Sequence, residues 1–483
     1  MLRTGLLLLG LSVALAGTAS AQTPARPAFP PPKTLGDVAA HGRHLERSLR
    51  LLATSTPGHR NTVKVLFYGQ SITEQDWTKE VASYLRQTYP DAHLVIENRA
   101  IGGHAAQLLV KTAEADLYPF YPDLVIFQVY GSHIEYENII RRIRERTTAD
   151  ILMQTDHLAR NEKVDEPNDP AHLTPQNWSP WMNYVFLPGT ATKYQTELVD
   201  QRNLWKQYLR DYHLEPGAVL IDAVHLNAQG NFLMAEIVKS YLRPTPGHVV
   251  PRSDVVKTFD VGNDLAWNDG VLALDFDGNR VDAVCGPGES GAPAEVRIDG
   301  RKPSEIAGLY ASSRTSVYPG SGWPVLLKVG ARVGRTRRQA EVQRVAEAWT
   351  LTFTELSPNL KQGQFRVEGS VTGPDGTGKL GERFVSKSGR VAIEPDDWNL
   401  DFSLAVFKRP IQSGQTVTWK TILMGTDRFL APDASADTTV ERTVTLAQGL
   451  SNGRHRLELR GAPGVPLKAV RVYQPPLGRD ADD

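Results

Sequence analysis

The chain has 483 residues, with 54 basic and 54 acidic side chains and a formal net charge of +0. That length exceeds what one hydrophobic core usually serves, so we expect two or three domains. The charge balance argues against a dedicated nucleic-acid binder, which normally carries a basic surplus. The single cysteine, Cys285, cannot form an internal disulfide, and its place after an apolar run predicts a buried side chain.

The first residues have the pattern of an exported protein. One arginine, Arg3, precedes the apolar run of residues 6–16, and the small-residue sequence Ala19-Ser20-Ala21 follows. The run is too short to span a membrane, so the pattern predicts a signal peptide over residues 1–21. Residues 22–33 are rich in proline and predict a tether. We therefore expect a secreted or periplasmic protein without a membrane span.

Residues 34–246 alternate between short apolar runs and amphipathic stretches. Apolar runs separated by helices indicate a parallel sheet covered on both faces. The segment from His157 to Thr190 shows no periodicity, and a loop of that length is often part of a binding site. The expected strands are residues 63–68, 93–97, 123–129, 150–154 and 218–221, and the expected helices are residues 75–87, 105–112, 136–146, 196–212 and 228–241.

The character of the chain changes after Pro244. Strand-like pieces separated by Gly, Asn and Asp predict a β-sandwich region over residues 247–483. Residues 255–323 and 431–476 look like two parts of one jelly roll, and residues 324–430 look like a second β unit inserted into it. Most tryptophans of this region are expected in its core, although some could form a sugar-stacking platform.

A serine stands directly after the first expected strand. In Gly69-Gln70-Ser71-Ile72-Thr73, Ser71 follows the apolar run of residues 63–67, and Thr73 is the expected N-cap of the next helix. A hydroxyl at this position faces a crevice lined by helix N-terminal N–H groups. Such a position suits a nucleophile that passes through an oxyanion.

Asp222 and His225 follow the last expected strand of the same domain. Acyl transfer by serine needs a hydroxyl, a base, a group that orients the base, and oxyanion donors. One loop at the carboxyl edge of the sheet can deliver both His225, as base, and Asp222, as its orienting group, to Ser71. The alternative is a helix cap with a surface histidine. The same spacing recurs at Asp169 and His172 without a preceding strand, and we attribute that copy to chance.

These motifs resemble those of the GDSL/SGNH hydrolases, a family of serine esterases. Residues 69–73 are similar to the family's Gly-Asp-Ser-Ile-Thr block, and residues 222–227 are similar to its last block. Between them, residues 98–103 resemble the second block, whose final glycine supplies an oxyanion N–H. The resemblance implies an α/β fold, a flavodoxin-like three-layer α/β/α sandwich, and it implies no metal or organic cofactor.

The resemblance also implies a role for each site residue. Ser71 would be the nucleophile, His225 the base and Asp222 the group that orients the base. The backbone N–H groups of Ser71 and Gly103 would bind the oxyanion. Gln70 stands where the family has Asp, which is tolerable because that side chain takes no part in proton transfer.

The largest departure from the family pattern follows the third expected strand. The family has Gly-x-Asn-Asp there, with the Asn side chain as an oxyanion donor, whereas residues 130–134 read Tyr-Gly-Ser-His-Ile. His133 takes the place of that Asn, and its ring N–H can replace the amide; losing such a donor costs about 10²–10³ in rate. The alternative is an ordinary loop histidine, with Ser132 or Asn138 donating instead.

Two side chains beside these motifs are candidate substrate contacts. Gln70 directly precedes Ser71, and His104 directly follows the Gly102-Gly103 pair. The alternative for His104 is a ring that is merely exposed to solvent.

Three other motif matches are set aside. Residues 449–453 fit Gly-x-Ser-x-Gly by letter, but Asn452-Gly453 predicts a hairpin turn, so the strand-to-helix context of a nucleophile elbow is missing. Residues 373–379 nearly spell a phosphate-binding loop, but Leu380 replaces its Ser/Thr and no helix is expected next. Asp156-His157 lacks metal-ligand spacing, and no compact His/Cys/Asp cluster predicts a metal site.

The sequence favours an exported serine esterase that cleaves small acyl esters, acetyl in particular, from a carbohydrate. The chemistry follows from the serine, histidine and aspartate; the carbohydrate follows from analogy with secreted family members that carry β-sandwich appendages. One alternative is a catalytically weakened glycan-binding protein, which the His133 departure favours. The other is a lipase or thioesterase, although residues 157–190 are mostly polar and show no apolar lid.

Overall fold

The computed structural model describes residues 29–165, 173–243, 255–286, 291–318, 322–331, 342–400, 405, 411–432, 437–461 and 464–478. The expected signal peptide, most of the tether and the second Asp-x-x-His copy lie outside these residues. Below, the described residues up to 243 are called the α/β part and those from 255 onward the β-rich part. Within the described ranges, no helix has both the length and the apolar character needed to cross a membrane.

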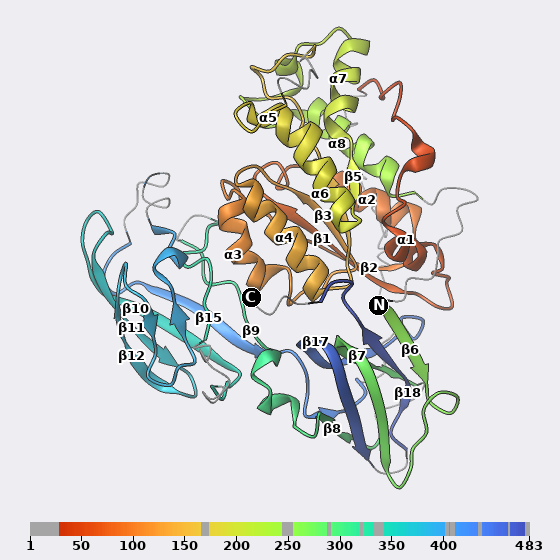
Figure 1. The fold of residues 1–483 in the computed structure, drawn as a ribbon, viewed down its shortest axis with the longest axis vertical. Helices are drawn as coiled ribbons and strands as arrows, with labels where there is room; N and C mark the ends of the chain where they lie inside the picture. The colour runs from red at the N-terminus through yellow and green to blue at the C-terminus, as the bar shows by residue number, and fades with distance from the viewer. Residues whose placement is uncertain are drawn as a thin grey trace, which may run out of the picture. The chain divides into compact units, whose positions relative to one another are not determined.

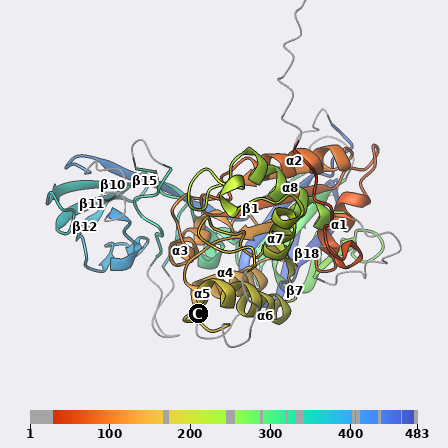
Figure 2. The same cartoon turned by 90° about the horizontal axis from the view of Figure 1, so that it is seen from above.

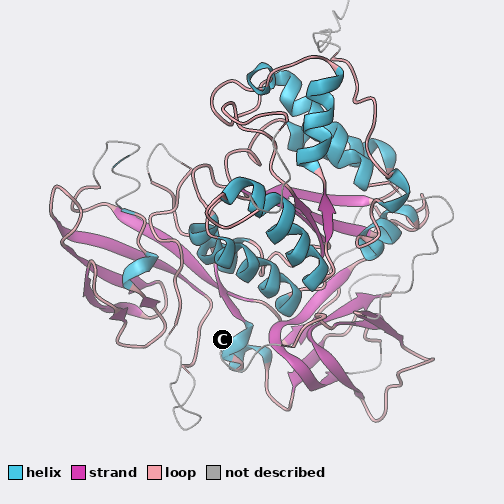
Figure 3. Ribbon diagram, turned by 45° about the horizontal axis from the view of Figure 1, so that its top comes forward, coloured by secondary structure: helices cyan, strands magenta, loops and turns pink. Residues whose placement is uncertain are grey.

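A five-stranded parallel sheet lies at the centre of the α/β part (Figures 1 and 3). Its strand order, β2-β1-β3-β4-β5, is the flavodoxin-like order, in which sites form at the carboxyl edge where the order reverses. The reversal lies between β1 and β3, where Gly69 pairs with Gln128 at the end of both strands. The strands are β1 (Thr62–Gly69), β2 (His93–Asn98), β3 (Leu124–Gln128), β4 (Asp150–Gln154) and β5 (Glu197–Val199).

Helices cover both faces of this sheet, which confirms the predicted three-layer α/β/α sandwich. Val65 and Phe67 of β1 pack with α1, α2, α7 and α8, whereas Leu66 and Tyr68 pack with α3, α4 and α6. This alternation follows from the two-residue period of a strand. The helices are α1 (Glu46–Ala53), α2 (Trp77–Thr88), α3 (Ala106–Asp116), α4 (His133–Arg146), α5 (Trp178–Trp181), α6 (Leu187–Tyr194), α7 (Gln201–Asp211) and α8 (Ala228–Tyr241), with 3-10 turns at Val38–Ala40 and Pro216–Val219.

The last strand of the sheet differs from the prediction. Residues 218–221 were expected as a strand, but Pro216–Val219 is a 3-10 turn, and Leu220 makes only an isolated bridge to Leu226. The fifth strand is β5, which the helical pattern of residues 196–212 concealed. The helix there starts late because Asp200 caps it, accepting from the Asn203 N–H at 3.4 Å.

The segment from His157 to Thr190 contains helices that its composition did not predict. α5 leads through a π-helical turn, Met182–Phe186, directly into α6. Pro188 directly follows the π-helical turn, where the regular α-helical hydrogen-bond pattern is already interrupted. Met182 and Leu187 are buried against the sheet face that α3 and α4 cover, so this segment is part of the core.

The β-rich part consists of antiparallel sheets (Figure 2). A six-stranded sheet has the order β16-β8-β17-β7-β18-β6, and a five-stranded sheet has the order β12-β11-β10-β15-β9. Cys285, at the end of β7, is buried as predicted. The strands are β6 (Val256–Asp260), β7 (Val271–Cys285), β8 (Ala294–Ile298), β9 (Tyr310–Ser312), β10 (Glu347–Leu356), β11 (Gly363–Gly369), β12 (Gly373–Lys379), β13 (Phe384–Val385), β14 (Ala392–Ile393), β15 (Thr416–Leu423), β16 (Arg428–Phe429), β17 (Thr443–Gly461) and β18 (Leu467–Tyr473), with 3-10 turns at Pro303–Glu305, Ala307–Leu309 and Pro395–Asp397.

The hairpin predicted at Asn452-Gly453 is wrong. β17 runs through these residues and pairs with β7 on both sides of them, with a register shift between Gln448 and Gly453. The segment is a bulge, and the Asn452 side chain donates to the Pro475 and Leu477 carbonyls at 2.9 and 2.7 Å. The partner strand β7 is long enough to pair with both halves of β17, and this pairing replaces the hairpin. The turn signal at Asn452-Gly453 contains no information about that partner.

The tryptophans of the β-rich part lie mainly in apolar cores, as expected. Trp349 and Trp419 are buried and stack with ring centroids 6.2 Å apart. Trp267 and Trp398 are half-buried against two separate cores. Trp323 is the exception, because it packs into the apolar cluster that α3 and α4 form in the α/β part.

Candidate active site

Ser71 lies just past the carboxyl end of β1, in a tight turn. Gly69 is required before it, since a Cβ there would stand 2.2 Å from the Gln128 carbonyl oxygen. The turn continues to Asp76 and α2 begins only at Trp77, so the prediction that Thr73 caps the helix is wrong. Thr73 is fully buried, with its hydroxyl turned to the Gln128 carbonyl at 3.5 Å.

The structure brings Ser71, His225 and Asp222 together. His225 Nε2 is 2.9 Å from Ser71 Oγ, and His225 Nδ1 is 2.7 Å from Asp222 Oδ2. Asp222 and His225 lie on the turn between the Pro216–Val219 3-10 helix and α8, and this turn reaches the end of β1. The arrangement is the hydrogen-bond chain that a serine nucleophile, its base and an orienting carboxylate require.

Backbone N–H groups hold Asp222 in its ionised form. Its Oδ1 accepts from the Val224 and His225 N–H groups at 2.9 and 2.8 Å. These bonds, with the His225 side chain, lower the pKa of Asp222 to about 2. The carboxylate is therefore charged at every ordinary pH and favours the tautomer with the proton on Nδ1, which leaves Nε2 to accept from Ser71.

Gln75 joins the turn of Ser71 to the loop of His225, a role that the sequence analysis missed. Its Nε2 donates to the Leu226 carbonyl at 3.0 Å, and its Oε1 accepts from the Leu226 N–H at 3.0 Å. This two-way bridge lies one residue from His225 and four from Ser71. An amide four residues after the candidate serine is the only sequence signal for it, and such a spacing is too common to be specific.

The segment after β4 also holds the His225 loop. His157 Nε2 lies 2.7 Å from the Val224 carbonyl, and burial lowers the pKa of His157 to about 4, so its neutral ring donates there. Arg160 donates from its backbone to the Ala223 carbonyl at 2.8 Å and from Nε to the Asp222 carbonyl at 2.7 Å. No sequence motif points to a role for either side chain.

The candidate oxyanion donor Gly103 lies in the turn after β2, at the same edge of the sheet. It is exposed and has φ +75°, a backbone conformation that favours glycine. His104, next to it, is fully buried, which rules out the alternative of a ring that is merely exposed to solvent. Gln70 is also buried, at 8% exposure. Both candidate substrate contacts therefore lie below the surface.

His133 is the first residue of α4 and lies at the carboxyl edge of β3. Its ring is half-buried and meets Trp181 and Phe186 edge-on, with centroids 5.1 and 5.4 Å away. Ser132 Oγ caps the helix at the Glu135 N–H, 3.4 Å away. Asn138, the other alternative donor, binds Glu135 at 3.1 Å. The neighbouring polar groups thus have local partners.

A second serine, histidine and aspartate meet on the six-stranded sheet. Ser451 Oγ is 3.2 Å from His455 Nε2, and His455 Nδ1 is 2.7 Å from Asp299 Oδ2. Here Nε2 also lies 3.0 Å from the carbonyl oxygen of Ser451 itself. Ser451 lies inside strand β17, without the strand-to-helix turn of a nucleophile elbow. This group is a useful comparison for the one at Ser71.

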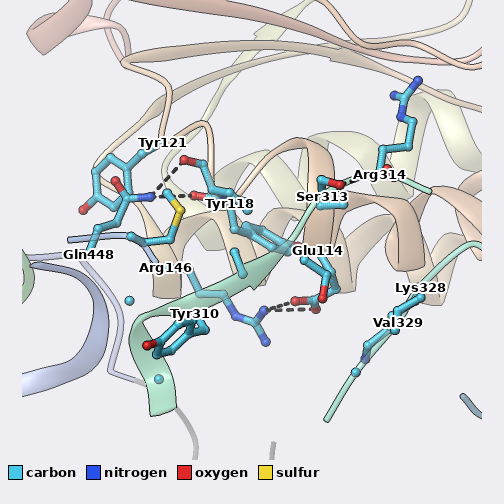
Figure 4. A pocket seen from close by; sticks show the side chains of 18 of the residues that line it. Glu114, Tyr118, Tyr121, Arg146, Tyr310, Ser313, Arg314, Lys328, Val329 and Gln448 are labelled. Atoms are coloured by element: carbon cyan, nitrogen blue, oxygen red, sulfur yellow. Dashed lines mark hydrogen bonds and ion pairs between the residues drawn. The ribbon is translucent and has the colours of Figure 1, made fainter. Parts of the chain in front are cut away.

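A cavity of about 270 Å³ lies between α3, the end of α4, β9 and residues 448–452 (Figure 4). Neither Ser71 nor His225 is among the described residues that line it. Two of its arginines form ion pairs: Arg146 binds Glu114 at 2.8 Å and Arg314 binds Asp116 at 2.8 Å. The cavity is therefore separate from the candidate site.

Asp156 lies buried beside the candidate site and gives a pH-dependent prediction. Burial raises its pKa from 3.8 to about 7, although Gln128 Nε2 donates to it at 3.0 Å. Between about pH 4 and 7 the folded protein therefore holds a proton that the unfolded chain has released, so this group weakens folding as pH rises. Asp156→Asn removes the effect, and Gln128 Oε1, which has no partner among the described residues, can turn to accept from the new amide.

We expect Asp156→Asn to gain stability over the wild type as pH rises from about 4 to 8, by on the order of 2–4 kcal/mol. Urea unfolding of both proteins across this range measures the difference in free energy. A difference that stays constant with pH would contradict the raised pKa.

No group of three or more His, Cys, Asp or Glu side chains that could hold a metal ion occurs in the described part of the chain.

Comparisons with known proteins find similar solved structures but no sequence relatives. No family model matches the chain, and no curated protein matches it. An acetylxylan esterase from Geobacillus stearothermophilus is 16% identical with a TM-score of 0.33, covering 41% of this chain and 100% of that one. A GDSL-like lipase from Parabacteroides merdae is 17% identical with a TM-score of 0.32, covering 39% and 100%. An α/β hydrolase from the metagenome of Lake Arreo, Spain, is 16% identical with a TM-score of 0.31, covering 37% and 94%.

Proposed function

We propose that this protein is a secreted serine esterase that hydrolyses small acyl esters, acetyl esters of carbohydrates in particular, through Ser71, His225 and Asp222. The observation that supports the proposal most is the continuous hydrogen-bond chain from Asp222 through His225 to Ser71, at 2.7 and 2.9 Å. It lies at the reversal of strand order in a parallel sheet, where sites of this fold form.

In the first half-reaction, Ser71 Oγ attacks the acyl carbon while its proton passes to His225 Nε2. The new C–O bond moves an electron pair onto the carbonyl oxygen, and the backbone N–H groups of Ser71 and Gly103 bind this oxyanion. When the intermediate collapses, His225 gives the proton to the leaving alkoxide, which departs as the alcohol. In the second half-reaction, a water oxygen attacks the acyl carbon while His225 Nε2 takes a proton from it. The bond to Ser71 Oγ then breaks, His225 returns the proton to Ser71, and the acid leaves.

Asp222 acts throughout as a fixed negative charge. Because its pKa is about 2, it stays ionised while His225 takes up the proton, and it stabilises the resulting imidazolium. Gln75, His157 and Arg160 hold the backbone around His225, so the base does not need to be ordered in each turnover.

The substrate class rests on the resemblance to the GDSL/SGNH hydrolases. The first experiment is acetate release by the purified protein from a panel of acetylated polysaccharides, together with aryl esters of increasing acyl length. Release from the polysaccharides with a sharp preference for acetyl supports the proposed substrate. Activity that rises with acyl length favours the lipase or thioesterase reading, and a folded protein without turnover favours glycan binding alone.

His133→Asn tests the oxyanion role of His133. If its ring N–H supplies the donor that the family takes from Asn, this variant keeps or raises kcat, whereas His133→Ala lowers it by about 10²-fold. Steady-state kinetics on an aryl acetate measures both. Equal losses in the two variants would instead assign His133 to packing against Trp181 and Phe186, its ring neighbours.

A further inference from the structure

The turn that carries Gly103 is held firmly by the α/β part. Glu74 Oε1 accepts from the Gly102 N–H at 2.8 Å, and a Cβ added to Gly102 would stand 2.6 Å from Glu74 Oε2. Asn98 Nδ2 donates to the Thr73 carbonyl at 2.6 Å. These contacts connect the end of β2 to the turn of Ser71. The Gly102–Gly103 peptide follows directly after them in the chain.

The β-rich part contacts the same turn from another side. Arg314, just after β9, donates to the Arg99 carbonyl at 2.9 Å. It also binds both carboxylate oxygens of Asp116 at 2.8 Å, and the Asp116 side chain is 3% exposed. A bidentate pair of this kind fixes geometry as well as charge. The start of the turn is thus attached to the β-rich part.

His104, at the end of the turn, lies between two residues of the β-rich part. The ring is 0% exposed and meets Trp323 at a centroid distance of 5.6 Å. Asn399 Nδ2 is 3.5 Å from His104 Nε2, so Nε2 is the acceptor. Burial lowers the pKa of His104 to about 4, while a hydrogen bond with the Gly102 backbone opposes the shift. The neutral ring therefore carries its one proton on Nδ1, available to the Gly102 carbonyl.

We propose that His104 is a positioning residue that aims the Gly103 N–H at the oxyanion, and that Asn399 and Trp323 hold His104 in place. A trans peptide is planar, so the Gly102 carbonyl and the Gly103 N–H point in opposite directions from one rigid unit. In this proposal His104 Nδ1–H binds the Gly102 carbonyl, and a carbonyl held in this way sets the direction of the Gly103 N–H. The inference rests on the proposed esterase function.

In this arrangement the β-rich part contributes to catalysis by fixing the direction of an oxyanion donor. An oxyanion donor is effective when it is already aimed before charge develops, because no reorganisation is then needed. The printed contacts of the α/β part hold residues up to Gly102, whereas Gly103 itself is exposed and, at φ +75°, keeps the backbone freedom of a glycine. Asn399 and Trp323, which come from a distant stretch of the chain, hold His104 and thereby restrict that freedom.

The test is His104→Phe, which keeps an aromatic ring beside Trp323 but has no N–H. We expect kcat on an aryl acetate to fall about 10- to 100-fold with KM nearly unchanged, because only the transition state carries the oxyanion. Phenylboronic acid, which adds to a serine hydroxyl as a tetrahedral anion, should lose affinity in parallel. His104→Asn, whose amide N–H can replace Nδ1–H, should restore part of kcat.

His41→Phe is the matched control. His41 is also a buried histidine, 7% exposed, with its pKa lowered by burial and its ring stacked on Tyr241 at 3.7 Å. Any loss of melting temperature from burying Phe in place of His should appear in both variants. The loss of kcat and of boronate affinity should appear only in His104→Phe.

Asn399→Ala is the second variant, and it changes only the β-rich part. It tests the positioning role of His104 even if His104→Phe does not fold. We expect a smaller loss of kcat, about 3- to 10-fold, again without a change in KM. If the variants that fold keep the wild-type kcat while Ser71→Ala is inactive, only the positioning role of His104 is overturned. A wild-type rate in Ser71→Ala overturns the esterase function and the positioning role together.

Discussion

Ser71→Ala should abolish ester hydrolysis while the protein remains folded. Loss of Oγ removes the atom that forms the acyl-enzyme, and kcat should fall by on the order of 10⁴–10⁶-fold. Gly69, Gln70 and the rest of the turn are unaffected, since Ser71 is only partly buried. Acetate release, circular dichroism and the melting temperature of the two proteins measure the effect.

Ser451→Ala provides a matched control within the same chain. Ser451 also has a histidine 3.2 Å from its hydroxyl and an aspartate behind that histidine, at 2.7 Å. Because Ser451 lies inside a strand, we expect its removal to leave hydrolysis at the wild-type rate. Loss of activity in Ser451→Ala with retention in Ser71→Ala would transfer the nucleophile to the β-rich part.

Asp222→Asn should lower kcat by about 10⁴-fold, with little effect on folding. Asp222 Oδ1 accepts from two backbone N–H groups, so the new amide keeps its oxygen there and turns its NH₂ toward His225 Nδ1. That donor forces the His225 proton onto Nε2, which then cannot accept from Ser71. The expected loss is therefore smaller than in Ser71→Ala, because the nucleophile and the oxyanion donors remain.

Asp222→Ala distinguishes the effect of the wrong His225 tautomer from the effect of losing the Asp222 carboxylate charge. Without any group at this position, His225 can adopt either tautomer, so we expect Asp222→Ala to retain as much activity as Asp222→Asn or more. The pH profile of kcat on an aryl acetate measures both variants. If Asp222→Asn retained wild-type kcat, the orienting role of Asp222 would be wrong.

Local patterns were sufficient for most of the α/β part. Nearly continuous apolar runs located β1 to β4 within one or two residues, because both faces of these strands are buried under helices. α8 begins and ends as predicted, at Ala228 and Tyr241. Ser71 was found because it follows the end of β1, whereas Asp222 and His225 were found after an expected strand that the structure replaces by a 3-10 turn.

The errors arise where tertiary contacts override local signals. β5 exists because β4 offers it a paired edge, although its residues continue into a helical pattern. The bulge at Asn452-Gly453 replaces a hairpin because β7 is long enough to pair with both sides. The burial of His104 could not be predicted because nothing near it in sequence covers it; Trp323 and Asn399 do so from more than 200 residues away.

The sequence by itself thus determined the parallel sheet with helices on both faces, because that depends on periodicity, and its motifs, through their resemblance to a known family, indicated the three-layer sandwich and the three residues of the candidate site. Only the tertiary structure decided the distances between Ser71, His225 and Asp222, the bridge from Gln75, and the burial of His104 under the β-rich part. These features depend on contacts between segments far apart in the chain. No local propensity encodes such contacts, because they are fixed only when the cores pack.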